Sequence, residues 1–292
     1  MYVVLGANGR AGGEAARALI ERGEAVRVVL RRREQGEKWA DLGAEVAVAS
    51  IEDAEAIADA LKGASGAFLI NPPPVSGDPY TRTEELGTAL AVAARRAHLP
   101  KAVVLSSIGA QHASGTGVIA TLNRFEALLD RVAPSIAFMR SGYFVETWGE
   151  MAETVMSESV LPTFIEPSRK IPMVSTIDVG RTAITLLGEE WTGKRVVELT
   201  GPEDWSAGDV VSAFAEILGR PVKSVFVPPE GRAALLAEEG VPAEVADALL
   251  GMYEGIANGL FTRQNDNEHR RGTTSLTTAI ERLVAKAHRA GR

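Results

Sequence analysis

Three glycines recur at three-residue intervals in the stretch VVLGANGRAGGEAARALIERG of residues 3–23. Gly6, Gly9 and Gly12 follow a short apolar run and precede a segment with helical periodicity, so they stand where a strand turns into a helix. Glycine lets backbone N–H groups approach a ligand without a Cβ atom in the way. The free N–H groups and the dipole of the helix favour an anion there. The context predicts binding of a dinucleotide pyrophosphate, and a tight turn without a ligand is the alternative.

A run of arginines, Arg31, Arg32 and Arg33, ends the next apolar stretch, VRVVL. Dinucleotide folds that prefer NAD place an acidic residue here to accept hydrogen bonds from the ribose 2′-hydroxyl, whereas folds that prefer NADP offer arginine. The guanidinium group is a permanently charged fork that fits phosphate oxygens. We therefore expect NADP(H) rather than NAD(H), with Arg31 as the first choice and Arg33 as the second for contact with the 2′-phosphate. An exposed charged helix start is the alternative for at least one of the three.

The scaffold for these residues is indicated by short β-branched runs that alternate with longer Ala-, Leu- and Glu-rich segments. This alternation predicts the α/β class, with a Rossmann-like, doubly wound parallel sheet built on right-handed crossovers. The expected strands are YVVLGA, AVRVVL, EVAVAS, GAFLIN, KAVVLSS and SIAFMRS. Helices are expected near 12–22, 34–42, 53–62, 80–98 and 118–132.

The pattern loosens after Arg140, which predicts a smaller C-terminal α/β lobe and a binding cleft between the two parts. Residues 1–140 are assigned to an NAD(P)-binding Rossmann domain, and residues 141–292 to a smaller substrate-binding lobe that is interleaved with it. The lobe is expected to contain short strands in KIPMVST and RVVELTG, helices near 206–219, 232–258 and 274–289, and an exposed loop in RQNDNEHRRG.

Five segments in this order, GANGRAGG, LRRREQ, FLINPPP, VVLSSIGA and FMRSGYFVE, resemble the NmrA-like family of atypical short-chain dehydrogenases/reductases over nearly the whole chain. The segment AEEGVPAEVADALLGMYEGIANGLF is similar to the bacterial NADPH:quinone reductases and triphenylmethane reductases of that family. The resemblance implies a Rossmann-like domain and a small lobe that closes over the nicotinamide end. The family includes NADPH-dependent reductases and catalytically silent redox sensors that bind transcription factors.

The resemblance also implies a set of cofactor-binding residues, taken over position by position. Where the family commonly has an aspartate that contacts the adenine amine, this chain has Ser50. The implied contacts are Gly6, Asn8, Gly9, Arg10, Ala11 and Gly12 around the pyrophosphate, Arg31 at the 2′-phosphate, Asn71, Pro72 and Pro73 along the ribose, and Ser106, Ser107, Gly142, Tyr143 and Phe144 beside the nicotinamide.

The proton-transfer pair of ordinary short-chain dehydrogenases, Tyr-x-x-x-Lys on one helix face, is missing. None of the tyrosines at 2, 80, 143 and 253 is followed by lysine four residues later, and Leu122 stands where the family often keeps a lysine or histidine. Hydride transfer to a quinone gives a delocalised oxyanion that can take its proton later from water, so positioning suffices. We therefore expect direct hydride transfer to a conjugated acceptor such as a quinone. A catalytically silent redox sensor that acts through a protein partner is the alternative, and a nucleotide-sugar epimerase is disfavoured because it generally needs the same pair.

No residue is assigned as a general acid, and Tyr143 and His112 are the candidates. Tyr143 could stack on an acceptor ring or simply pack at the lobe junction. His112 could reach the cleft and donate a proton near neutral pH, and a solvated side chain is the alternative. It lies in the Gly- and Ser-rich loop 107–117, which is expected to act as a mobile flap. Glu126 is interpreted as an exposed or capping carboxylate. Trp148 and Met151 are interpreted as the apolar roof of the pocket or as core.

Composition excludes several other classes. The chain has 31 basic and 38 acidic residues and a formal net charge of −7, which disfavours direct binding of nucleic acid or an anionic membrane. It has no cysteine, and its four histidines show no metal-ligand spacing, so no metal site is predicted. The first apolar stretch is too short for a signal peptide or a membrane span. We expect a cytoplasmic protein with a small-molecule partner, and a homodimer stays open as its assembly.

Overall fold

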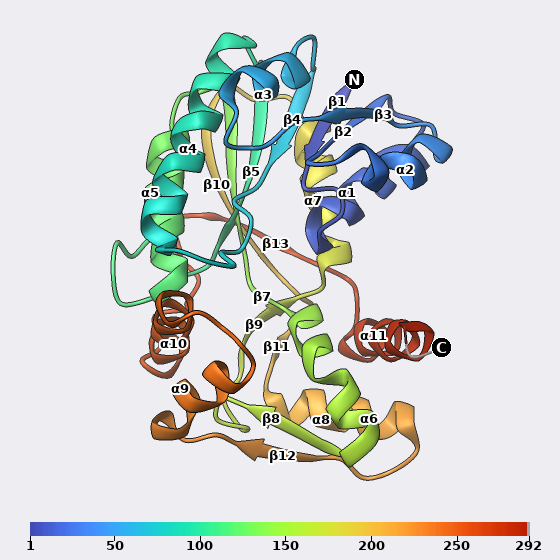
Figure 1. Ribbon diagram of the computed structural model, residues 1–292, viewed down its shortest axis with the longest axis vertical. Coiled ribbons are helices and arrows are strands. Elements are labelled where there is room, and N and C mark those ends of the chain that lie inside the picture. Colours follow the sequence, from blue (N-terminus) through green and yellow to red (C-terminus); the bar gives the residue numbers. More distant parts are fainter. Residues whose placement is uncertain (291–292) are drawn as a thin grey trace.

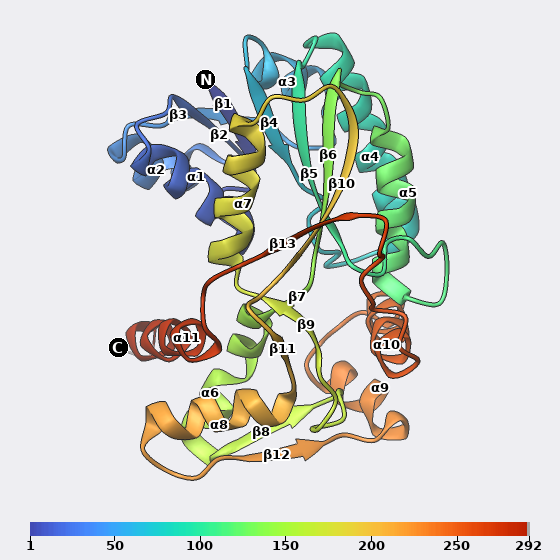
Figure 2. The same cartoon turned by 180° about the vertical axis from the view of Figure 1, so that it is seen from behind.

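The computed structural model describes residues 1–290 and shows a large sheet with helices on both faces and a smaller lobe (Figure 1). The lobe lies beyond the carboxyl ends of the central strands, and the chain passes between the two parts several times (Figure 2). Within the described residues, no helix is both long and apolar enough to cross a membrane.

The large sheet contains eight strands, each parallel to its neighbours, in the spatial order β13-β10-β6-β5-β4-β1-β2-β3. The part from β3 to β6 confirms the predicted doubly wound, Rossmann-like sheet. Its order reverses between β1 and β4, and in such sheets ligands bind at the carboxyl ends of the strands at this reversal. The strands are β1 (Tyr2–Leu5), β2 (Val26–Leu30), β3 (Glu45–Val48), β4 (Gly66–Leu69), β5 (Lys101–Ser107), β6 (Ser135–Ser141), β10 (Gly193–Thr200) and β13 (Glu268–Arg271).

Helices cover both faces because the central strands are apolar on both sides. The adjacent residues Val3 and Val4 are both fully buried, yet they belong to hydrophobic clusters on opposite faces. The first face carries α3 (Ala54–Leu61), α4 (Pro79–Arg96) and α5 (Ala120–Leu129), and the second carries α1 (Arg10–Glu21), α2 (Glu37–Asp41) and α7 (Thr176–Gly188).

Two strands from the second half of the chain extend the large sheet, and this corrects two predictions. The segment RVVELTG lies in β10, which pairs with β6 from Gly193 to Leu199 instead of forming a short strand of the lobe. The end of RQNDNEHRRG forms β13 instead of a loop. The fully buried carboxylate of Glu198 fixes the turn before β13 by accepting hydrogen bonds of 2.9 Å from the Gln264 N–H and from Nδ2 of Asn267.

The lobe has its own hydrophobic core, which includes Trp148, Phe214 and Ile280. Trp148 is 5% exposed and Met151 packs against this core, so both fit the core interpretation. Two small sheets, β11-β9-β7 and β12-β8, lie among the helices. The elements are β7 (Tyr143–Phe144), α6 (Ala152–Glu158), β8 (Val160–Thr163), β9 (Ile171–Val174), β11 (Asp204–Trp205), α8 (Ala207–Leu218), β12 (Lys223–Phe226), α9 (Pro229–Glu238), α10 (Ala243–Ala257) and α11 (Leu276–Ala290).

The predicted helix 232–258 is divided in two, α9 and α10. Gly240 has a φ of +75° and Pro242 stands directly before α10. A left-handed glycine ends a helix, and proline cannot continue one, so the chain breaks there.

Close glycine contacts hold α10 against the loop 107–117. A Cβ atom on Gly251 would lie 2.9 Å from the Cα atom of Gly117, and one on Gly255 would lie 2.8 Å from the carbonyl oxygen of Gly115. Residues four apart lie on the same face of a helix, so these two glycines form one contact surface. The loop predicted to be a mobile flap is therefore packed against the lobe.

Candidate functional site

The Gly-rich turn leaves the first N–H groups of α1 without a side-chain acceptor. Gly6 has a φ of +65°, which glycine adopts without strain, and its carbonyl oxygen accepts a 2.8 Å hydrogen bond from the Gly9 N–H. Gly9 occupies the N-cap position of α1, and no side chain caps the helix. The N–H groups of Arg10, Ala11 and Gly12 and the positive end of the helix dipole therefore meet in one place.

Gly12 is required by the packing of α1 on this turn. A Cβ atom there would lie 2.4 Å from the carbonyl oxygen of Gly6 and 2.8 Å from that of Leu5. Both contacts are with backbone, which cannot rotate away. The turn and the helix thus form a fixed cradle of backbone N–H groups, and this cradle fits a dinucleotide pyrophosphate.

Asn8 holds the turn against the segment that follows β2. Its Nδ2 donates a 3.3 Å hydrogen bond to the carbonyl oxygen of Gln35, and its Oδ1 accepts a 2.9 Å bond from Nε1 of Trp39. Asn8 is exposed beside the turn, and these two bonds tie the turn to the residues after β2.

Arg10 connects the turn to the lobe. Its Nη2 lies 2.6 Å from Oε1 of Glu150, and its Nη1 donates a 3.3 Å hydrogen bond to Oγ1 of Thr147. Both partners belong to the 3₁₀ segment Val145–Met151 that enters the lobe. The Arg10 and Glu150 side chains are 41% and 58% exposed, so this ion pair is accessible to solvent.

The carboxyl end of β2 presents Arg31, Arg32 and Arg33, all exposed. Across residues 1–290, their guanidinium groups form no hydrogen bond or ion pair with protein. Nearby, the Ser50 hydroxyl donates a 2.7 Å hydrogen bond to Oε2 of Glu52. This bond is the largest cause of a lowered pKa of the Glu52 carboxyl, and two arginine charges, that of Arg31 among them, act in the same direction. A carboxylate is thus present beside Ser50, where the family's aspartate is missing.

Asn71 and the two prolines after it lie at the carboxyl end of β4, beside the Gly-rich turn. Nδ2 of Asn71 donates a 2.9 Å hydrogen bond to Oγ1 of Thr83 on α4. Ile70 fills the space next to Gly6, where a Cβ atom would lie 2.1 Å from its Cδ1 atom. The structure therefore brings the predicted ribose residues to the β1/β4 reversal.

Glu126 forms a buried ion pair, so its interpretation as an exposed or capping carboxylate is wrong. It is 9% exposed, and it accepts hydrogen bonds of 2.9 Å and 2.7 Å from Nε and Nη2 of Arg140. The side chains of both residues are 11% exposed. Burial acts to lower the pKa of Arg140, but the hydrogen bonds and charges of Glu126 raise it overall. The reason lies in the fold: α5 turns Glu126 toward the neighbouring strands β5 and β6.

Ser106, which the resemblance places beside the nicotinamide, belongs to the same network. The residue is 2% exposed, and its hydroxyl donates a 2.6 Å hydrogen bond to Oε1 of Glu126. Ser107 lies on the opposite face of the strand because successive side chains alternate. Its partly exposed hydroxyl donates a 2.9 Å bond to the carbonyl oxygen of Ile108.

Gly142 makes the crossing from the large sheet to the lobe. Its N–H donates a 2.8 Å hydrogen bond to the carbonyl oxygen of Leu199, and a Cβ atom on it would lie 2.6 Å from the carbonyl oxygen of Pro172. Tyr143 and Phe144 then form β7, which pairs with β9. Gly142, Tyr143 and Phe144 therefore lie where the carboxyl end of β6 meets the lobe.

Tyr143 is paired with Tyr253 of α10, a residue that the sequence analysis did not single out. The two hydroxyl oxygens lie 3.5 Å apart, and the Tyr143 ring lies 5.9 Å from that of Trp148. Burial, followed by the nearby Tyr253, holds the pKa of Tyr143 well above its ordinary value. The charge of Glu150 also raises the pKa of Tyr143, and that of Arg10 lowers it. Tyr143 is thus a neutral hydroxyl at physiological pH.

His112 is partly exposed in the loop before α5, and its side chain forms no hydrogen bond with any part of the described chain. Its backbone N–H donates a 3.1 Å bond to the carbonyl oxygen of Gly109. The structure does not pair it with Tyr143, the other candidate acid.

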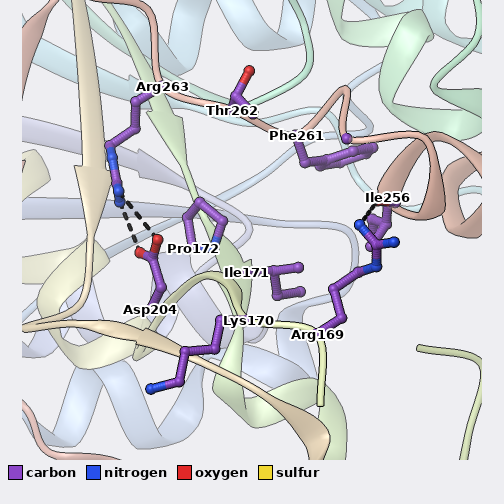
Figure 3. A pocket seen from close by; sticks show the side chains of 10 residues that line it. Arg169, Lys170, Ile171, Pro172, Asp204, Ile256, Phe261, Thr262 and Arg263 are labelled. Atoms are coloured by element: carbon purple, nitrogen blue, oxygen red, sulfur yellow. Dashed lines mark hydrogen bonds and ion pairs between the residues drawn. The ribbon is translucent and has the colours of Figure 1, made fainter. Parts of the chain in front are cut away.

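A separate pocket of about 230 Å³ is lined by Ile171 and Pro172 of β9 and Asp204 of β11, among others (Figure 3). Arg263 closes one side through hydrogen bonds of 2.7 Å and 3.1 Å to the carboxylate of Asp204, and Arg169 reaches toward the carbonyl oxygen of Ile256 on the other (Figure 3). None of the lining residues belongs to the Gly-rich turn or to the ends of β1, β2 or β4. This pocket is therefore distinct from the dinucleotide cradle.

A comparison with protein families matches residues 2–282 to the NmrA-like family. The chain belongs to the NmrA-like family. This confirms the resemblance drawn from the Gly-rich turn and the segments at the ends of the predicted strands.

Relatives of this NmrA-like chain include the NAD(P)H azoreductase of Xenophilus azovorans, 22% identical over 255 residues that cover 87% of this chain and 86% of that protein. The structure of an NADPH-dependent quinone oxidoreductase from Escherichia coli, complexed with NADPH, is 22% identical, with a TM-score of 0.81 over 97% of this chain and 99% of that one. The Citrobacter sp. triphenylmethane reductase complexed with NADP(H) is 20% identical, with a TM-score of 0.79 over 98% of this chain and 100% of that one. These structural likenesses establish the NmrA-like fold.

Sequence reasoning missed Glu150 and Tyr253 as parts of this NmrA-like site. Their partners Arg10 and Tyr143 are 140 and 110 residues away in the chain. One signal was available for Tyr253, since it lies in the segment that carries the resemblance to the quinone reductases. No local pattern marks Glu150, because its partner Arg10 lies 140 residues earlier in the chain.

Proposed function

We propose that the protein is an NADP(H)-dependent oxidoreductase that transfers hydride directly to a conjugated acceptor such as a quinone. The observation that carries the proposal is the uncapped N-terminus of α1 on the Gly-rich turn, next to the arginines at the carboxyl end of β2. The names of the three relatives support it, because azo, quinone and triphenylmethane compounds are all conjugated.

The cofactor preference follows from the charges at the end of β2. The backbone N–H groups of the turn would bind the pyrophosphate, and Arg31, with Arg33 second, would bind the 2′-phosphate. No acidic residue stands directly after β2 to accept hydrogen bonds from a ribose 2′-hydroxyl. These features favour NADP(H) over NAD(H).

The choice of acceptor follows from the missing proton-transfer pair. A bound nicotinamide supplies a hydride ion. Tyr143 lies toward the same end of the site, but its hydroxyl faces Tyr253, and no lysine follows it four residues later to lower its pKa. The aromatic residues therefore orient an acceptor ring, and the proton comes from water after transfer. Loss of a general acid costs about 10²- to 10⁴-fold in rate for a simple ketone, so aliphatic ketones are disfavoured.

The test is oxidation of NADPH by the purified protein, followed through its near-ultraviolet absorbance, with a panel of quinones and matched aliphatic ketones. We expect acceptor-dependent oxidation with quinones and none with ketones. Equal rates for the two classes would contradict direct transfer without a proton donor.

The cofactor preference is tested by the affinities of Arg31→Ala for NADPH and NADH. Charge-assisted hydrogen bonds to one phosphate are worth about 1.5–3 kcal/mol, so NADPH affinity should fall about tenfold to hundredfold while NADH affinity stays unchanged. Arg32→Ala is the matched control, since it removes the same charge from the neighbouring exposed position. An unchanged preference for NADPH in Arg31→Ala would remove Arg31 from this role.

A redox sensor is the second candidate, and the Arg10–Glu150 contact favours it. This ion pair joins the cofactor turn to the lobe, so a ligand that draws Arg10 to its pyrophosphate would release Glu150 and free the lobe to move. Tight binding of NADPH without turnover across many acceptors would support the sensor over the enzyme.

A further inference from the structure

Arg232 of α9 is buried without a carboxylate partner. It is 5% exposed, and its Nε donates a 3.0 Å hydrogen bond to the carbonyl oxygen of Val227. In the part of the chain that the structure describes, its two Nη atoms have neither a hydrogen-bond nor an ion-pair partner. Arginine is rarely buried this deeply unless it is paired, because removing its charge from water is costly.

A row of aromatic side chains connects Arg232 to the candidate site. The Cζ atom of Arg232 lies 5.3 Å from the ring centroids of both Phe164 and Phe226. Phe164 meets the Tyr253 ring edge to face, with centroids 5.1 Å apart, and Tyr253 meets Tyr143 through its hydroxyl. We call Tyr143, Tyr253, Phe164 and Phe226 the aromatic row. All four are at least partly exposed, so the row offers ring surface to a ligand.

The free end of the Arg232 guanidinium keeps some contact with solvent. Within residues 1–290, neither Nη atom is both fully buried and without a partner, so these unpaired atoms retain some solvent-accessible surface. The carboxylates of Glu230 and Glu254 lie close enough to act on its charge, yet neither comes within ion-pair distance. Burial is the main cause that lowers the pKa of Arg232. The guanidinium therefore has open donors and a positive charge that the protein does not neutralise by direct contact.

We infer that Arg232 binds an anionic substituent of the acceptor, a carboxylate, sulfonate or phosphate, while the conjugated part of the acceptor lies along the aromatic row. This inference rests on the proposed function, since it names the class of acceptor for the same site. The guanidinium lies within cation–π distance of two phenylalanine rings, and its planar fork suits two oxygens of one anionic group. The protein thus selects conjugated acceptors that carry a negative charge at one end.

The kinetic test compares naphthoquinone with naphthoquinone sulfonate as acceptors for the wild-type protein and for Arg232→Met. We expect kcat/KM for the sulfonate to fall about tenfold to hundredfold, because charge-assisted hydrogen bonds are lost, and kcat/KM for the neutral quinone to change less than about threefold. Arg181→Met is the matched control: it removes the same charge from an exposed position on α7. Equal losses for both quinones, or no loss for either, would overturn the inference.

Binding is measured separately, by calorimetry with naphthalene sulfonate and its neutral sulfonamide, neither of which accepts hydride. The wild-type protein should bind the sulfonate about tenfold more tightly, and Arg232→Met should remove that difference. If neither quinone is reduced, the proposed function fails, and the calorimetry still tests Arg232. If thermal unfolding shows that Arg232→Met is not folded, Arg232→Lys replaces it and should lose part of the preference. Equal binding of sulfonate and sulfonamide by the wild type would by itself contradict the inference.

Discussion

Substitution of Gly12 by alanine tests whether the Gly-rich turn is a cofactor cradle. The added Cβ atom would lie 2.4 Å and 2.7 Å from the carbonyl oxygen and carbon of Gly6, and 2.8 Å from the carbonyl oxygen of Leu5, whereas ordinary contact begins at 3.4 Å. All three atoms belong to the backbone, so α1 must move away from the turn by about 1 Å, the difference between 3.4 Å and 2.4 Å. The N–H groups of Arg10 and Ala11 move with it.

The magnitude follows from two opposing contributions to stability and one to binding. Overpacking costs about 1–3 kcal/mol, and replacing glycine by alanine in a helix contributes about 1 kcal/mol in the other direction. We expect Gly12→Ala to lower the free energy of unfolding by up to about 2 kcal/mol. A single misplaced N–H donor to the pyrophosphate costs about 1.5–3 kcal/mol, so NADPH should bind about tenfold to hundredfold more weakly.

The assay combines calorimetric titration with NADPH and urea unfolding of the apoprotein. Gly188→Ala is the matched control, because Gly188 ends α7 and a Cβ atom there has nothing within 4 Å. It should bind NADPH as the wild type does and be equally or slightly more stable. If Gly12→Ala binds NADPH with wild-type affinity, the turn is a structural feature only, and the reasoning from backbone N–H groups to cofactor is refuted.

Three further predictions concern Glu126, Glu150 and Tyr143. Glu126→Ala leaves the buried charge of Arg140 unpaired and should lower the free energy of unfolding in urea by about 3–5 kcal/mol; a loss below about 1 kcal/mol would mean that water replaces the pair. Glu150→Gln removes a solvent-exposed competitor for Arg10, so NADPH affinity should rise by up to about fivefold at low salt, and weaker binding would show that Glu150 helps to hold the cofactor. Because burial holds the pKa of Tyr143 well above its ordinary value, its hydroxyl stays protonated, and kcat with a quinone should be flat from about pH 6 to pH 9. Tyr143→Phe should retain at least about a tenth of that kcat, and a loss of 10²-fold or more would identify Tyr143 as a general acid.

The central sheet and the Gly-rich turn could be predicted from local sequence. Strands buried on both faces are continuous apolar runs, so the segments of β1, β2, β4, β5 and β6 are recognisable one by one. The glycine spacing from Gly6 to Gly12 lies within one strand-to-helix turn, and the arginines after β2 follow a single strand. In each case the residues that act together are close in sequence, and backbone sterics alone limit what they can form.

Two predictions were wrong for a common physical reason: Glu126 was expected to be exposed or to cap a helix, and the segment that forms β13 was expected to be a loop. A glutamate on a helix, or a charged run such as EHRR, is exposed in most proteins, and only a specific partner makes burial or pairing favourable. Arg140 supplies that partner for Glu126, and Glu198 and its hydrogen bonds to the turn supply it for β13. Arg140 is 14 residues from Glu126 and Glu198 is 66 residues from Gln264, and in both cases the sheet and not a local repeat brings the partners together.

The sequence by itself determined the fold class, the place of the Gly-rich turn and the charge of the segment after β2, because each depends on residues within one or two elements. Only the tertiary structure decided which side chains meet at the far end of the site. Arg10 reaches Glu150 across 140 residues and Tyr143 reaches Tyr253 across 110, because the chain leaves the sheet after β6 and returns through α10. Such contacts depend on strand order and on the path of the crossings, and one sequence carries no local pattern that records them.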